Sequence, residues 1–378
     1  MREVLQPLAE WWRRGEAVGM ATVVATFRSA PRPPGASMLV GADGSAVGSV
    51  SGGCVEGAVY DLAQTVVAEG RPRLHRYGVS DDDAFEVGLT CGGILDVYVE
   101  KVDQETFPEL GEVVDDLEHD RPVAVATVVD HPDPDRIGGR MFVRPGADGS
   151  VTSTGSLGTP RIDDAVRDDA LGLLAAGHSA VLTYGPEGER RGEGMRVFVW
   201  GFAPPPRMIV FGAIDFAAAV ARMSGFLGYH VTVCDARPVF ATATRFPSAD
   251  EVVVSWPHKY LQAEADAGRL DGRTVLCVLT HDPKFDVPLL EVALTLPEVG
   301  YIGAMGSRRT HDDRLARLRE AGVDEKALER LASPIGLDLG ARTPEETAVS
   351  IAAEIIAQRW GGGGERLAAL EGRIHHGS

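Results

Sequence analysis

Met208-Ile209-Val210-Phe211-Gly212 is the stretch that sets the fold class we expect for the second half of the chain. Four consecutive apolar residues predict a strand buried on both faces, and a helix-like apolar pattern follows at 216–227. Further strands are expected at 230–234, 251–255, 274–279 and 301–304, alternating with helices at 260–267, 287–296 and 308–321. This alternation predicts an α/β fold with a doubly wound parallel sheet.

The ligand-binding edge of such a sheet lies at the carboxyl ends of its strands. Gly212 ends the first strand and Asp235 ends the second, as the first glycine and the ribose-binding acid of a dinucleotide fingerprint do. Ile214 occupies the second glycine position, where a branched side chain opposes the approach of a pyrophosphate, and Asp215 adds negative charge beside it. Ordinary NAD(P) binding is therefore not favoured, and an NAD(P)-dependent oxidoreductase is kept as the alternative function.

A second candidate for phosphate binding is the turn at 303–309, which leads from a strand end into a helix. It contains Gly303, Gly306, Ser307 and Arg308, and glycines with an arginine at a helix start suit an anion. An ordinary strand-to-helix turn explains the same residues equally well.

Composition places the chain among folded globular proteins. It has 378 residues, 44% of them hydrophobic, which is enough for two or three domains. The net charge of −18, without any basic block, argues against nucleic acid or an anionic membrane as partner. No bilayer-spanning stretch and no signal-peptide core stand out, so a cytoplasmic location is expected. Four cysteines without a Cys-x-x-Cys pattern indicate neither a disulfide scaffold nor a structural zinc site.

The first half of the chain contains an internal repeat. Residues 18–24 match 123–129 and residues 41–45 match 146–150, both at an offset of 105 residues (123 − 18 and 146 − 41). A shared offset over two separate blocks predicts two related α+β units that pack as a pseudo-symmetric pair. With Pro204-Pro205-Pro206 as a stiff linker, we expect domains at 1–105, 106–203 and 204–378.

The run Ser51-Gly52-Gly53-Cys54-Val55-Glu56 brings a cysteine to the start of an expected helix. Apolar residues at 55, 59, 62 and 66 recur at helical spacing, so we expect Cys54 in the first turn, with backbone N–H groups pointing toward its sulfur. That position lowers the pKa of a thiol and favours a thiolate nucleophile or metal ligand. Glu56 opposes this effect if its carboxylate points at the sulfur.

A second run, Cys91-Gly92-Gly93, mirrors the first. Glycines beside both sulfurs, Gly52 and Gly53 in one run and Gly92 in the other, leave room for a ligand to approach the backbone. Two small buried cysteines are an equally good interpretation of the same runs. Continuing the register of the repeat pairs Thr159 with Cys54 and Arg191 with Cys91, so the second unit is expected to lack both sulfurs.

Together these motifs resemble the XdhC/CoxI family, the accessory proteins of molybdenum hydroxylases such as xanthine dehydrogenase. Besides the two cysteine runs, the resemblance is carried by Asp235-Ala236-Arg237-Pro238, Thr280-His281-Asp282, Tyr301-Ile302-Gly303-Ala304-Met305-Gly306-Ser307 and Ser333-Pro334-Ile335-Gly336. It covers roughly residues 18–100 and 207–359. The family usually has Gly-x-Gly-His after the first strand of its Rossmann-like domain, whereas this chain has Gly212-Ala213-Ile214-Asp215.

The resemblance implies a carrier that binds molybdenum cofactor, supports its sulfuration by a cysteine desulfurase, and hands it to the apo-hydroxylase. Because soft sulfur donors suit molybdenum, Cys54 is the expected metal ligand, with Cys91 as the second sulfur of the site. The anionic cofactor phosphate needs donors, for which Arg28, Arg32 and the turn at 303–309 are candidates. Whether the protein forms a homodimer is left open.

Overall fold

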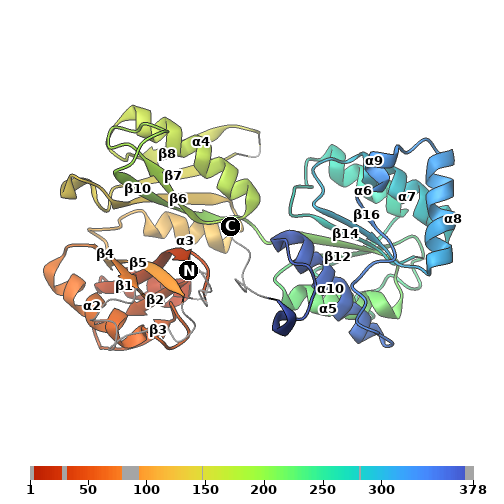
Figure 1. Ribbon diagram of the computed structural model, residues 1–378, viewed down its shortest axis with the longest axis horizontal. Helices are drawn as coiled ribbons and strands as arrows, with labels where there is room; N and C mark the ends of the chain where they lie inside the picture. Colours follow the sequence, from red (N-terminus) through yellow and green to blue (C-terminus); the bar gives the residue numbers. More distant parts are fainter. Residues whose placement is uncertain (1–3, 28–31, 79–92, 147, 281, 371–378) are drawn as a thin grey trace. The chain divides into compact units, whose positions relative to one another are not determined.

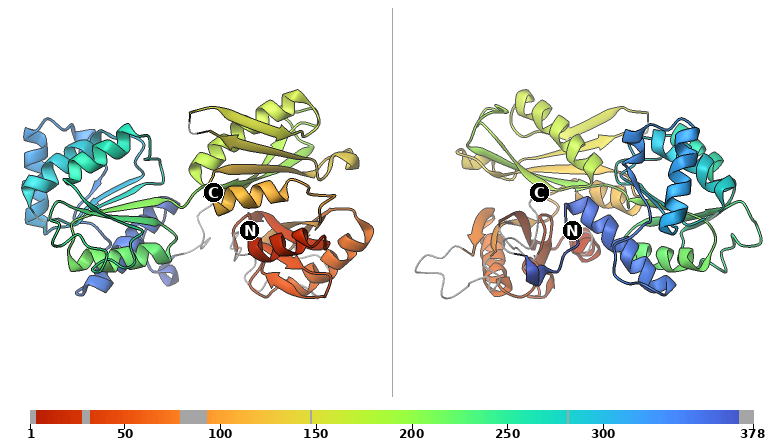
Figure 2. Two further views of the ribbon diagram at one scale, coloured as in Figure 1. Left: turned by 180° about the vertical axis from the view of Figure 1, so that it is seen from behind. Right: turned by 45° about the vertical axis from the view of Figure 1, so that its right-hand side comes forward.

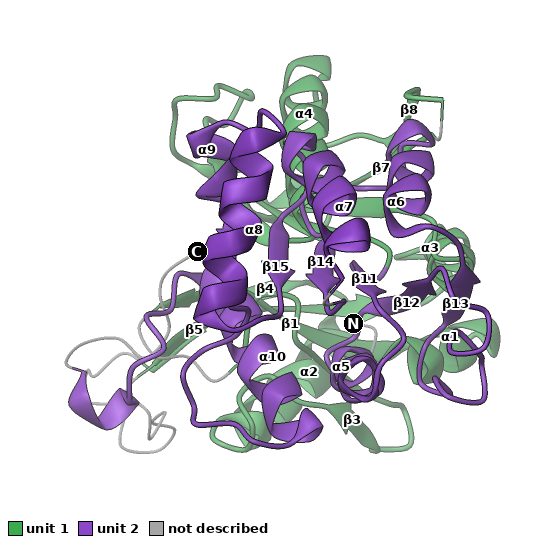
Figure 3. Ribbon diagram, turned by 90° about the vertical axis from the view of Figure 1, so that its right-hand side faces the viewer, with its two compact units in different colours: residues 1–204, 372–377 green, residues 205–371, 378 purple. Residues whose placement is uncertain are grey.

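A computed structural model describes residues 4–27, 32–78, 93–146, 148–280 and 282–370 (Figure 1). The chain folds into two compact units, one up to Pro204 and one from Pro205 to Glu371 (Figure 3). The first unit contains two antiparallel sheets and the second one parallel sheet, which confirms the expected fold class. No helix within the described ranges is both long and apolar enough to cross a membrane.

The first sheet has the strand order β3-β2-β1-β5-β4. Its strands are β1 (Val18–Phe27), β2 (Ser37–Val40), β3 (Ala46–Gly48), β4 (Arg73–Tyr77) and β5 (Ile94–Val102). The hairpin between β2 and β3 turns at Gly44, whose φ of +80° is the conformation that an Asp-Gly pair supplies. Helix α2 (Glu56–Glu69) packs on one face of this sheet and ends at Gly70, a left-handed cap.

The second sheet repeats this arrangement with the order β8-β7-β6-β10-β9. Its strands are β6 (Val123–Asp130), β7 (Arg140–Pro145), β8 (Val151–Gly155), β9 (Ala180–Tyr184) and β10 (Met195–Phe202), and a short 3-10 turn, η2 (Pro134–Arg136), precedes β7. Helix α4 (Pro160–Ala176) packs on one face, as α2 does on the first sheet (Figures 1 and 2). The two sheets therefore have the same strand order, as the sequence repeat predicts.

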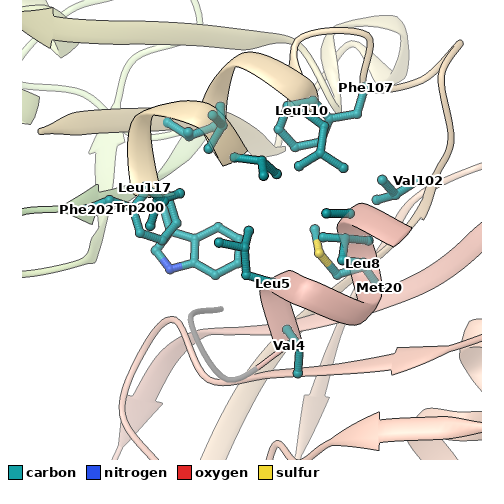
Figure 4. Close-up of a cluster of buried hydrophobic side chains, with 14 of the residues drawn as sticks. Val4, Leu5, Leu8, Met20, Val102, Phe107, Leu110, Leu117, Trp200 and Phe202 are labelled. Carbon is teal, nitrogen blue, oxygen red and sulfur yellow. The ribbon is translucent and has the colours of Figure 1, made fainter. Parts of the chain in front are cut away.

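The other faces of the two sheets share one hydrophobic core with α1 (Leu5–Arg13) and α3 (Leu110–Glu118). Figure 4 shows Leu8 and Met20 from the first repeat in the same cluster as Trp200 and Phe202 from the second. Asp96, nearly fully buried on β5, also binds Arg76 of its own sheet and Arg196 of the other. This common core makes the two repeats one compact unit, while their division into separate domains stays a prediction.

The second unit is a six-stranded parallel sheet with the order β13-β12-β11-β14-β15-β16. Its strands are β11 (Arg207–Phe211), β12 (His230–Asp235), β13 (Glu251–Val254), β14 (Val275–Val278), β15 (Tyr301–Ala304) and β16 (Leu331–Ala332). Its helices are α5 (Asp215–Phe226), α6 (Pro257–Asp266), α7 (Pro283–Thr295), α8 (Arg308–Glu320), α9 (Glu325–Leu328) and α10 (Pro344–Trp360), followed by the short turn η3 (Leu367–Ala369). Numbered from β11, this is the order 3-2-1-4-5-6 of a Rossmann fold.

The sheet of the second unit lies between two helical layers (Figure 3). Helices α5 and α10 cover one face through side chains such as Val220 and Ile351, and α6, α7 and α8 cover the other through residues such as Leu289 and Leu318. Because both faces are covered, the strands consist of the continuous apolar runs seen in the sequence. The carboxyl ends of β11, β12 and β14 are left at one edge.

Candidate functional site

Cys54 lies on a loop that joins β3 to α2, two residues before the helix begins. Helix α2 starts at Glu56 with Val55 as its cap residue, so the prediction that Cys54 occupies the first turn is wrong. The reason lies in the two preceding glycines, because Gly52 has a φ of +77° and Gly53 a φ of +120°. Neither value is compatible with a right-handed helix, and the chain reaches helical geometry only after Cys54.

The carboxylate of Glu56 folds back and holds this loop together. One oxygen accepts hydrogen bonds from the Ser49 hydroxyl (2.6 Å) and the Ser51 N–H (2.9 Å). The other accepts from the Ser51 hydroxyl (2.5 Å), the Gly53 N–H (2.8 Å) and the Val55 N–H (3.2 Å). Burial by itself would raise the pKa of Glu56, but the hydrogen bonds from Ser49 and Ser51 outweigh it and lower the pKa to about 2.

The Cys54 side chain is partly buried, and its backbone is fixed by the same network. The Cys54 N–H donates to the Ser51 hydroxyl oxygen at 2.9 Å, and the Val55 N–H donates to the same oxygen at 3.0 Å. The N–H groups of Cys54 and Val55 are therefore used inside the loop. Glu56 is likewise directed into the loop through its five donors.

The second repeat has an equivalent loop, also held by a carboxylate, but without a cysteine. Asp163 accepts from the Ser156 hydroxyl and the Leu157 N–H, both at 2.7 Å, just as Glu56 accepts from Ser49 and from a backbone N–H. A loop held by a carboxylate is therefore common to both repeats, and the cysteine distinguishes the first copy.

This correspondence corrects the register between the repeats. Gly48 and Gly155 end equivalent hairpins, and at each a Cβ would lie 2.3 Å from a carbonyl oxygen of the neighbouring strand. Glu56 therefore corresponds to Asp163, and Cys54 to Arg161. The prediction that Thr159 is the counterpart of Cys54 is wrong by two residues. The hairpin of β7 and β8 is longer than that of β2 and β3, so the offset between the repeats before the hairpin no longer applies after it.

The two copies also differ in where their helices start. Helix α4 begins at Pro160, capped by the Thr159 hydroxyl, and Pro160 corresponds to Gly53. In the first copy the same positions form the loop, since Gly52 and Gly53 unwind what is a helical turn in the second copy. The glycine pair thus presents the thiol on a loop instead of on a helix.

Gly53→Ala is expected to destabilise the first unit by about 1–2 kcal/mol, because an alanine at a φ of +120° is strained. A Cβ at this position meets nothing within 4 Å, so the loss would come from the backbone alone. Gly57→Ala, inside α2 and equally free of contacts, is the matched control and is expected to stabilise slightly. Urea denaturation of both variants measures the difference, and equal stabilities would contradict the account of the loop.

Other residues predicted for this site are placed only in part. Arg32 lies partly buried before β2. Cys91, Gly92 and Arg28 lie outside the described residues, so the pairing of Arg191 with Cys91 stays a prediction as well. Across the described ranges there is no group of three or more His, Cys, Asp and Glu side chains that could hold a metal ion.

At the edge of the parallel sheet, Gly212 and Asp235 come together as the sequence predicts. Gly212 makes the turn after β11 with a φ of +113°, and a Cβ there would lie 3.0 Å from the Thr280 nitrogen. Asp235 is buried and accepts from the Ala213 N–H (2.7 Å), the Arg237 N–H (2.9 Å) and the Arg237 guanidinium (3.0 and 2.8 Å). Burial opposes ionisation of Asp235, but these partners outweigh it and lower its pKa.

The residues of the predicted phosphate-binding turn at 303–309 lie in two different elements. Gly303 lies inside β15, where a Cβ would come within 2.5 Å of the Ile335 side chain, so packing explains this glycine. Gly306, Ser307 and Arg308 do lie together at the start of α8. The Ser307 hydroxyl caps the helix by accepting from the Thr310 N–H at 3.1 Å, which uses one of its first N–H groups.

The fold and the site define a class: proteins that join a duplicated α+β unit, with a cysteine loop in its first repeat, to a Rossmann-type unit. The family model described as the XdhC Rossmann domain matches residues 208–355. The model of the XdhC and CoxI family matches residues 11–78 and again residues 117–185, once in each repeat. The chain belongs to the XdhC/CoxI family.

Relatives match the chain over nearly its whole length. It is 29% identical to a Bacillus subtilis protein named as a probable xanthine dehydrogenase subunit, over 91% of this chain and 93% of that protein. It is 26% identical to the "Molybdenum cofactor insertion chaperone PaoD" of Escherichia coli over 95% of this chain and 88% of that protein. A crystal structure described as a xanthine dehydrogenase from Bacillus halodurans matches with a TM-score of 0.68 and 27% identity, covering 97% of both chains.

Proposed function

We propose that this chain is an accessory protein that binds molybdenum cofactor and delivers it to a xanthine dehydrogenase-type molybdenum hydroxylase in the cytoplasm. The observation that carries the proposal is the Cys54 loop, where a glycine pair replaces a helical turn and presents a thiol. The near full-length similarity to PaoD, which is named as a molybdenum cofactor insertion chaperone, supports the same function.

The chemistry of the loop suits this cargo. Molybdenum in the cofactor has soft sulfur ligands, and a cysteine thiolate is the protein donor that matches them. We propose that Cys54 ligates the metal while a cysteine desulfurase supplies the sulfur that matures the cofactor, with Cys91 as the second sulfur. Arg28, Arg32 and the start of α8 at Ser307 and Arg308 remain our candidates for holding the cofactor phosphate.

The alternative, an NAD(P)-dependent oxidoreductase, fits the sheet edge poorly. Asp235 would have to accept the ribose hydroxyls, but its oxygens already accept from Ala213 and Arg237. Ile214 lines the pocket at the turn where a dinucleotide needs a glycine. We therefore assign no hydride transfer to this chain.

The proposal is tested by incubating the purified chain with molybdenum cofactor and separating bound from free cofactor by gel filtration. We expect the cofactor to elute with the protein and the loaded protein to activate an apo-hydroxylase of the xanthine dehydrogenase type. The same apo-enzyme with free cofactor is the control. Cofactor that elutes entirely with small molecules, with no activation, would contradict the proposal.

A further inference from the structure

The second unit contains a cavity of about 290 Å³ at the carboxyl edge of its sheet. Ile214 follows β11, Asp235 ends β12 and is followed by Ala236 and Arg237, and Thr280 follows β14. In the strand order of this sheet, the space between β11 and β14 is the switch point, where chains leave the sheet toward opposite faces. This crevice is where open α/β sheets bind their ligands.

The walls of the cavity have two kinds of chemistry. One part is apolar and is made by the side chains of Ile214, Ala236, Pro257 and Phe285. The Phe285 ring is backed by Trp256, with the ring centroids 5.3 Å apart. The rest is polar and includes Asp282 and Lys284. The Lys284 ammonium lies over the Phe285 ring, 4.7 Å from its centroid, so the apolar and polar parts of the wall adjoin there. Apolar side chains beside a few fixed polar groups suit a nucleobase joined to a sugar.

Two features exclude a pyrophosphate from its usual place beside this crevice. The branched side chain of Ile214 lies in the cavity wall at the position where the backbone would have to be open. Asp215 is the first residue of α5, and its side chain is 88% exposed and lies 3.4 Å from the Arg245 guanidinium. Its carboxylate puts negative charge on the helix end that would otherwise attract a phosphate and also occupies the nearby arginine. The pyrophosphate of a dinucleotide therefore can neither approach the backbone closely nor be attracted by the helix end.

The ribose needs a hydrogen-bond acceptor other than Asp235. A carboxylate has about four lone-pair directions, and Asp235 already accepts four hydrogen bonds from Ala213 and Arg237. Asp282, which also lines the cavity, accepts from the Lys284 N–H (3.1 Å) and pairs with the Lys284 ammonium (2.9 Å). It keeps acceptor capacity for the two adjacent hydroxyls of a ribose.

The size of the cavity agrees with one nucleoside. Pockets for drug-sized ligands span about 300–1,000 Å³, and the 290 Å³ found here lies at the lower limit.

We propose that this cavity binds a single nucleoside unit, with its base against Phe285 and Pro257 and its ribose hydroxyls donating to Asp282, and that it makes no use of a 5′-pyrophosphate. This goes beyond the proposed handling of molybdenum cofactor and does not depend on it. The full chain is titrated with adenosine, cytidine, guanosine, AMP and NADH, with binding followed by calorimetry. We expect at least one of the three nucleosides to bind. We expect AMP to bind with an affinity similar to that of adenosine, and NADH to bind no more tightly than adenosine.

Two variants locate the site. Asp282→Ser keeps a capping hydroxyl at the start of α7 and is expected to weaken nucleoside binding about tenfold, because the ribose loses its acceptor. Asp313→Asn, which removes an exposed carboxylate from an ion pair on α8, is the matched control and should bind as the natural chain does. Thermal unfolding of each variant confirms that it is folded.

A double variant tests the exclusion of the dinucleotide. Ile214→Gly with Asp215→Ser is expected to raise the affinity for NADH about tenfold or more relative to the affinity for adenosine, which loses the Ile214 contact in the same variant. The proposal is overturned if no nucleoside binds the natural chain, if NADH binds over tenfold tighter than adenosine, or if Asp282→Ser and Asp313→Asn bind equally. None of these results bears on whether molybdenum cofactor is retained.

Discussion

Cys54→Ala is expected to lower the amount of molybdenum cofactor retained by the chain at least 10- to 100-fold, the range over which even the residues around a metal's ligands act. The substitution removes the thiol that the Gly52-Gly53 loop presents, while the network of Ser51 and Glu56 stays intact. Retention after gel filtration is measured together with unfolding by urea, and we expect the stability to change little.

The second sheet supplies the matched control for this experiment. Arg161→Ala alters the corresponding position of the repeat and should leave cofactor retention unchanged. Cys277→Ala controls for the loss of any thiol, because Cys277 is fully buried in β14. Equal loss of cofactor in Cys54→Ala and Arg161→Ala would show that the loop is not the binding site.

Thiol reactivity tests the premise without any cofactor. Burial raises the pKa of both Cys234 and Cys277 to about 12, so neither thiol should react with iodoacetamide at neutral pH in the folded protein. Cys54, whose side chain is only partly buried, is expected to react faster than either of them, as followed residue by residue with mass spectrometry. A Cys54 thiol that reacts no faster than Cys234 and Cys277 would mean that the loop does not present it to solvent.

The parallel sheet could be predicted almost completely from the sequence, because its strands are buried on both faces. A run such as 208–211 is apolar at every position, and the structure places β11 at Arg207–Phe211. Strand β16 has only two residues and no periodicity to detect. Helix α3 is absent from the sequence-based expectations, although Leu110, Val113, Val114 and Leu117 recur at helical spacing and are all buried, so a signal for it does exist.

The cysteine loop could be located from the sequence but its form could not. The glycine pair marks the loop, yet the same glycines prevent the helix from starting at Cys54. Whether a carboxylate points at a sulfur or into its own loop depends on hydrogen bonds from Ser49 and Ser51, which no spacing rule supplies. The predicted correspondence between residues of the two repeats is wrong for a related reason. The longer hairpin of the second repeat shifts all later residues without changing the strand order.

Glu56→Gln is expected to lower the free energy of unfolding at pH 7 by about 2 kcal/mol. The change in pKa from 4.5 to about 2 corresponds to about 3 kcal/mol, which we reduce because the carboxylate is partly exposed to solvent. A glutamine also turns an amide donor toward N–H groups of Ser51, Gly53 or Val55 that need an acceptor. Asp163→Asn, which affects the donors Ser156 and Leu157 in the loop without a cysteine, should cost less and serves as the control.

The contribution of Glu56 to the free energy of unfolding is expected to decrease in acid. Because the pKa of Glu56 is lower in the folded chain than in the unfolded chain, its contribution is complete above about pH 4.5 and is lost as the pH falls toward about 2. The natural chain should therefore lose this stability in acid, whereas Glu56→Gln has no carboxylate there to protonate. Urea denaturation at pH 7 and pH 3 should show the gap between the two proteins shrinking to less than half. A gap of the same size at both pH values would mean that the ionised carboxylate does not hold the Cys54 loop.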